Sequence, residues 1–73
     1  MEQFKIRGAI GGRTIEATVN ANSAEEAEDY FVELYRKATR VTERKIQIVE
    51  VESQGVIAGY HVGLAKGSTI DIA

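Results

Sequence analysis

The sequence predicts a single α+β domain over residues 1–73, with the order ββαββ and one helix packed on one face of an antiparallel-rich sheet. Two alternating stretches separated by a glycine pair predict an N-terminal hairpin. One capped stretch with apolar residues three or four positions apart predicts the helix. Two more alternating stretches follow it, and a fifth, short strand would end the chain.

The chain has 73 residues, of which 44% are hydrophobic, and it contains no cysteine. This length is near the lower limit at which a hydrophobic core stabilises a domain without staples. No apolar run is long enough for a membrane span, and the first residues lack the apolar segment of a secretory signal. We therefore expect a cytoplasmic protein with no membrane partner.

The first two predicted strands flank Gly11-Gly12. Two glycines supply the positive-φ residues of a type I′ hairpin turn. With this two-residue loop, Gly8 faces Ile15, and the apolar residues of both strands fall on the same side of the ribbon. The pattern and the turn therefore predict the same register.

The stretch 23–39 is predicted to be the only helix. Ser23, followed three residues later by Glu26, forms a capping box. Acidic residues crowd the first turns and basic residues follow at the end, an order that complements the helix dipole. One apolar stripe would pack on the sheet, and it comprises Ala24, Ala27, Phe31, Leu34 and Ala38.

The stretch 44–52 is predicted to be the third strand, but its apolar pattern changes phase. Ile48 lies on one face, whereas Val49 and Val51 lie on the other. A β-bulge near Ile48 would restore the register. Burial of both faces would also explain the pattern, and we favour this interpretation because a central strand is buried most.

The remaining residues are predicted to form a hairpin and a short edge strand. Residues 53–55 are typical of a turn, and 56–64 alternate as a fourth strand. A second turn at 66–68 then precedes a short edge strand at 69–72.

Signals of enzyme chemistry are nearly absent. His61, the only histidine, lies between glycines on a predicted strand, with Asp71 or Glu50 as the nearest carboxylate candidates. Ser53 and Ser68 lie in turns without a base nearby in sequence. Capping and the helix dipole account for the acidic residues of the first helical turns. We therefore expect no catalytic residue, cofactor or metal.

The charge distribution gives one candidate site. The net charge of −2 argues against a polyanion-binding surface over the whole chain. Between residues 36 and 45, however, five basic residues stand against Glu43 alone. Their side chains suit phosphate oxygens, although a solvated helix end explains them equally well. The five are Arg36, Lys37, Arg40, Arg44 and Lys45.

Three segments in a fixed order carry a family resemblance. They are Phe4-Lys5-Ile6-Arg7-Gly8; Asn20-Ala21 leading to Glu25-Glu26; and Arg40-Val41 followed by Lys45-Ile46-Gln47-Ile48 and Glu50-Val51. Over roughly residues 3–52 the chain thereby resembles the archaeal LX family of large-subunit ribosomal proteins. The resemblance implies a ribosome-associated, RNA-binding module whose partners are ribosomal RNA or ribosomal proteins. The RNA contacts that it implies are Lys5, Arg7, Arg40, Arg44 and Lys45.

The chain departs from the family in three places. Gly11-Gly12 stands where members carry a longer polar insert, and the helix ends without the family's glycine-containing turn. Residues 55–73 have no counterpart in the resemblance. A shared fold alone would say little about function.

A protein-binding inhibitor is the alternative function. Small size, mild acidity and the absence of catalytic groups are typical of phage- or mobile-element-encoded proteins that block a host nuclease or CRISPR effector. Its acidic helix face would dock on a basic nucleic-acid channel. This face comprises Glu25, Glu26, Glu28, Asp29 and Glu33.

The pattern of the C-terminal half also predicts that the chain associates with a second copy of itself. A helix of about 16 residues is roughly 24 Å long and covers one sheet face, while the phase change leaves apolar side chains on the other. A second copy in an isologous dimer would cover them, unless a bulge returns them to the helix side. The candidates are Val49, Val51, Ala58, Tyr60 and Val62.

Overall fold

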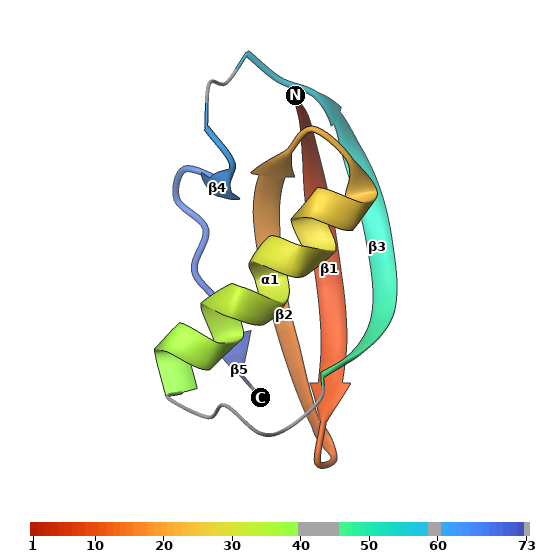
Figure 1. Cartoon of the computed structure of the whole chain (residues 1–73), viewed down its shortest axis with the longest axis vertical. Helices are drawn as coiled ribbons and strands as arrows, with labels where there is room; N and C mark the ends of the chain where they lie inside the picture. The colour runs from red at the N-terminus through yellow and green to blue at the C-terminus, as the bar shows by residue number, and fades with distance from the viewer. Residues whose placement is uncertain (40–45, 59–60, 73) are drawn as a thin grey trace.

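A sheet and one helix laid across it form the two layers of the fold (Figure 1). The computed structural model describes residues 1–39, 46–58 and 61–72. In chain order the elements are β1 (Glu2–Ile10), β2 (Arg13–Ala21), α1 (Ala24–Thr39), β3 (Gln47–Val56), β4 (Gly63–Leu64) and β5 (Asp71–Ile72). The strands lie in the order β3-β1-β2-β4, and β5 also pairs with β2. The predicted α+β class and single domain are confirmed.

The N-terminal hairpin has the predicted register. Ile10 pairs with Arg13, and Gly8 pairs with Ile15. The φ angles of Gly11 and Gly12 are 54° and 81°, which is the region that a type I′ turn requires at both positions. The inward residues Phe4, Ile6 and Gly8 of β1 therefore lie opposite the buried residues Val19, Ala17 and Ile15 of β2.

The start of α1 carries the predicted cap in a modified form. The N–H of Glu26 donates to Ser23 Oγ at 3.1 Å. The Glu26 carboxylate does not return to Ser23, as a standard capping box would have it. Instead its Oε1 accepts from the backbone N–H of Asn22 at 2.9 Å and from the Asn22 side-chain amide at 3.1 Å. The Glu26 carboxylate thus holds Asn22, the residue that precedes the helix cap, in place.

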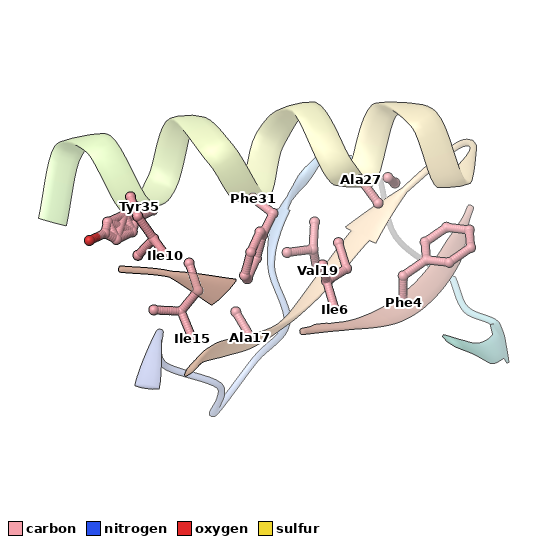
Figure 2. Close-up of a cluster of buried hydrophobic side chains, with 10 residues drawn as sticks. Phe4, Ile6, Ile10, Ile15, Ala17, Val19, Ala27, Phe31 and Tyr35 are labelled. Atoms are coloured by element: carbon pink, nitrogen blue, oxygen red, sulfur yellow. The ribbon is translucent and has the colours of Figure 1, made fainter. Parts of the chain in front are cut away.

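The core lies between α1 and the β1–β2 hairpin (Figure 2). Phe31 is fully buried, and its ring packs over the centre of the sheet. A Cβ built on Gly8 would lie 3.1 Å from the Phe31 ring, so the missing side chain is what lets the helix approach β1. The buried core comprises Phe4, Ile6, Ile10, Ile15, Ala17, Val19, Ala21, Ala27, Phe31 and Tyr35.

The phase change in the third strand comes from a β-bulge, so the interpretation that both faces are buried is wrong. Ile6 pairs with Val51 and Gly8 pairs with Ile48, and the register shifts between these pairs. The shift leaves Val49 as the extra residue, 57% exposed. Ile48 and Val51 both pack against the core on the helix side. The strand is also an edge strand and not a central one.

The predicted turn at residues 53–55 is likewise wrong. β3 runs through it to Val56, because Ser53 and Gly55 continue the pairing with β1. A second register shift leaves Gln54 as an extra residue, and Gly55 has a φ of 111°. The local turn signal therefore marks an irregularity inside a strand. The predicted fourth strand over 56–64 is reduced to β4, which lies at the opposite edge of the sheet.

Two short strands share the outer edge of β2. β4 pairs with Val19 and Asn20, and β5 pairs with Ile15 and Glu16. Between them a turn is closed by the Ser68 N–H donating to the Ala65 carbonyl at 2.9 Å. The Ser68 hydroxyl accepts from the Thr18 N–H at 3.2 Å, where the backbone ladder is interrupted. The second predicted turn and the short edge strand are therefore present.

Candidate binding surfaces

Lys5 and Arg7 lie on the sheet face away from α1, because they alternate with the buried residues of β1. Lys5 Nζ is 3.5 Å from Glu16, and Arg7 contacts Glu16 at 3.8 Å and Glu50 at 3.6 Å. Exposed ion pairs of this kind contribute little stability. They do balance the charge locally, so both cations already face carboxylates on the neighbouring strands.

Arg36 and Lys37 are exposed in the last turn of α1, in the helix layer. Lys37 Nζ lies 3.6 Å from the Glu33 carboxylate. Lys5 and Arg7 lie on the other side of the sheet, so the structure does not bring these four described cations together on one face. The other three, Arg40, Arg44 and Lys45, lie outside the described residues.

Three acidic side chains form an exposed line along α1. Glu25, Asp29 and Glu33 are spaced four residues apart and are all exposed. The line is offset by two positions from buried Ala27 and Phe31, and two helical residues turn about 200°, so it faces away from the sheet. We call these three residues the acidic stripe.

The other two predicted acidic residues do not extend this line. Glu26 is half-buried and bonded to Asn22 in the helix cap. Glu28 is also half-buried and lies on the flank of the helix. The predicted acidic face therefore consists of the three residues of the acidic stripe.

Of the four described candidates for self-association, two pack against the core and two are exposed. The bulge turns Val51 to the helix side, and Val62 also packs against the core. Val49 and Ala58 are exposed, and Tyr60 lies outside the described residues. Among the described residues, the face that the helix leaves open carries charged side chains from three strands.

Of the side chains considered for catalysis, both serines form hydrogen bonds within the fold and the histidine is exposed. Ser53 Oγ donates to Glu2 Oε2 at 2.8 Å, and Ser68 Oγ is occupied by the Thr18 N–H. His61 is exposed. Within the part of the chain that the structure describes, no group of three or more His, Cys, Asp or Glu side chains could hold a metal ion.

One exposed surface, the outer edge of β3, is not predicted by the sequence pattern. Glu52 and Val56 lie on the outer edge strand, and Val56 is 82% exposed. With a turn predicted at 53–55, Glu52 and Val56 belonged to two different predicted strands, so one continuous edge strand was not expected. The alternation of polar and apolar residues ends at Glu52, so it gives no signal that the strand continues through residues 53–55.

No protein-family model, curated protein or solved structure matches this chain. The resemblance to the LX family therefore stays a prediction that depends on three segments. In the described ranges no helix is long and apolar enough to cross a membrane.

Proposed function

We propose that this chain is a non-enzymatic binding module that docks on a basic protein surface through the acidic stripe of α1. The observation that carries the proposal is the geometry of Glu25, Asp29 and Glu33, which repeat every four residues and point away from the core. Two successive steps of four residues span roughly 12 Å along the helix. A line of carboxylates of this length is complementary to a row of basic side chains. Lys37 lies 3.6 Å from Glu33 and balances it in part, whereas no ion pair among the described residues involves Glu25 or Asp29.

The charge arrangement favours protein over nucleic acid as the partner. Lys5 and Arg7 are within 4 Å of carboxylates. Phosphate binding would have to displace these carboxylates, while the net charge of −2 opposes association with a polyanion. A basic channel that normally holds nucleic acid is the opposite case, because the acidic stripe would be attracted to it. A nuclease or a CRISPR effector has such a channel.

Inhibition of DNA cleavage tests the proposal. A panel of purified nucleases and CRISPR effectors would be titrated with the protein, at low and at moderate salt. We expect inhibition of at least one enzyme that weakens as salt rises. Asp29→Lys should raise the inhibitory concentration about tenfold or more, because a contact between opposite charges becomes a contact between like charges.

Asp71→Lys is the matched control. It makes the same charge change at an exposed position of β5, on the sheet edge. Inhibition that responds equally to both substitutions would reflect net charge and contradict docking through the helix. The absence of salt-dependent inhibition across the panel would also count against the proposal.

RNA binding at the C-terminal end of α1 is the second candidate. The exposure of Arg36 and Lys37, directly before the basic run, supports it together with the LX resemblance. The test is an electrophoretic shift with a structured ribosomal RNA fragment over a salt series. Arg36→Glu with Lys37→Glu should abolish binding at moderate salt.

Arg13→Glu serves as the control for this candidate, because Arg13 is exposed at the hairpin. Binding lost equally in the control would mean unspecific attraction to the polyanion. No shift at low salt would exclude the RNA candidate and leave the acidic-stripe proposal untouched.

A further inference from the structure

β3 is a long strand with one edge free of any described partner. Its inner edge pairs with β1, and it ends the strand order of the sheet. Alternate residues of such a strand direct their N–H and C=O groups away from the sheet. Between the two bulges, residues 50–53 keep a regular register. This regular stretch can accept backbone hydrogen bonds from one more strand.

The same edge carries both large hydrophobic side chains that are exposed in the described part of the chain. Val49 is 57% exposed and Val56 is 82% exposed. They lie on either side of the regular stretch, one at a bulge and one at the end of β3. Bulges and charged residues are common means of protecting a free edge. Exposed valines at both ends of a stretch do not protect an edge, and they are suited to contact with another chain.

The charged side chains of residues 50–53 determine which strand sequences can pair with this regular stretch. Glu50 and Glu52 lie on the sheet face opposite α1, because their partners on β1 are Arg7 and Lys5. Glu50 contacts Arg7 at 3.6 Å. Among the described residues, no ion pair involves Glu52, which is exposed.

A second copy of this chain is a poor occupant of the edge. An antiparallel pair with its two-fold axis at Val51 would place Glu50 opposite Glu52 of the other copy. An axis at Glu50 or at Glu52 would place each of these residues opposite itself. Like charges directly opposite one another destabilise a strand pair. The two glutamates therefore reject self-pairing through the regular stretch.

We infer that the free edge of β3 accepts an extended segment of another protein that carries two basic residues two positions apart. Two residues at this spacing point to the same side of a strand, so they can lie opposite Glu50 and Glu52. Backbone hydrogen bonds would hold the segment, the basic pair would set its register, and apolar residues at its ends would meet Val49 and Val56. This surface is separate from the acidic stripe and does not depend on it.

Two synthetic peptides test the inference on the intact protein. The first is acetyl-Val-Thr-Val-Thr-Lys-Val-Lys-Val-amide, whose terminal valines lie opposite Val56 and Val49 when its lysines lie opposite Glu52 and Glu50, and the second replaces both lysines with glutamates. Amide chemical shifts of the ¹⁵N-labelled protein would be followed during each titration, together with amide hydrogen exchange. We expect the lysine peptide to shift and to protect amides of residues 49–56, and the glutamate peptide to leave them unchanged.

Charge reversal on the protein sharpens the test. Glu52→Lys should weaken binding of the lysine peptide about tenfold, because an attraction between opposite charges becomes a repulsion between like charges of similar size. The same variant should gain binding of the glutamate peptide. Asp71→Lys, on β5 at the opposite edge of the sheet, makes the same charge change and should leave both peptides unaffected.

Three results would overturn the inference. The first is perturbation of α1 with no protection in β3, and the second is equal sensitivity to Asp71→Lys and Glu52→Lys. The third is a β3-linked dimer in sedimentation at tens of micromolar, since a second copy would then occupy the edge. Perturbation of α1 would agree with docking through the acidic stripe, and the other two outcomes do not concern that stripe, so the two proposals fail separately.

Discussion

Replacing Gly8 with alanine should destabilise the domain, because three neighbouring atoms leave too little room for a methyl group. A Cβ at this position would lie 2.9 Å from Ile46 Cγ2, 3.1 Å from Phe31 Cε2 and 3.2 Å from the Gln47 carbonyl oxygen. The Ile46 side chain is half-buried and can move. The Phe31 ring is fully buried, and the Gln47 carbonyl belongs to the backbone of β3, so neither can move freely.

The expected cost follows from two opposing effects. Overpacking of a core costs about 1–3 kcal/mol. Alanine restricts the unfolded chain more than glycine does, and this raises the free energy of unfolding by about 0.4–1 kcal/mol. The net loss for Gly8→Ala is then about 1–2 kcal/mol. In a domain of this size such a loss lowers Tm by about 5–15 °C.

Urea unfolding followed by circular dichroism measures this loss, with Gly63→Ala as the matched control. Gly63 also lies in a strand, but its Cβ would meet only the Tyr30 hydroxyl, at the ordinary contact distance of 3.7 Å. The control should be neutral or stabilised by up to about 1 kcal/mol. Equal free energies of unfolding for the two variants would refute the packing argument.

A double variant identifies the contact responsible. Ile46→Ala removes the atom nearest to the new methyl group. The combined cost with Gly8→Ala should therefore be smaller than the sum of the two single costs. Strict additivity would mean that Ile46 is not the source of the strain.

Three further substitutions test individual parts of the fold. Ser23→Ala removes the acceptor of the Glu26 N–H and should cost about 1 kcal/mol in urea unfolding; a cost near zero would mean that the cap contributes nothing. Phe31→Ala should cost about 3–5 kcal/mol, visible as a large loss of Tm, since the ring is fully buried; a loss below 1 kcal/mol would contradict the central position of this ring. Ser68→Ala removes the acceptor of the Thr18 N–H, so exchange of that amide should accelerate while the amide of Ile6 is unaffected, and unchanged exchange of Thr18 would contradict the role of the hydroxyl.

The first half of the chain could be predicted because its signals are local and agree with one another. Gly11-Gly12 demands a particular turn, and the alternation on both sides fits only one register. Ser23 fixes the start of the helix in the same way, through a bond that spans three residues. In each case, the residues that specify the structure are neighbours in sequence.

The second half was predicted less well because distant pairing overrides local preference. Ser53-Gln54-Gly55 has the composition of a turn, but pairing with β1 extends the strand and absorbs Gln54 as a bulge. Val49 is a similar extra residue, so the phase change that suggested a buried central strand reports an irregular edge strand.

The candidate sites follow the same division. The acidic stripe could be predicted from helical spacing alone. The separation of Lys5 and Arg7 from the basic end of the helix could not, because it depends on which sheet face α1 covers. The free edge of β3 depends on the strand order, which no local pattern in this sequence specifies.

The central position of β1 has a consequence for how the chain is made. Its partner β2 follows immediately, whereas β3 is complete only at Val56, which pairs with Glu2 at the other end of the chain. At a synthesis rate of about 5–20 residues per second, a finished hairpin waits roughly 2–7 s for its third strand. During that interval the second edge of β1 is unpaired, and the apolar face of the hairpin is uncovered until α1 is complete at Thr39. Nascent chains that stop before the end of the helix should therefore be the most prone to aggregate.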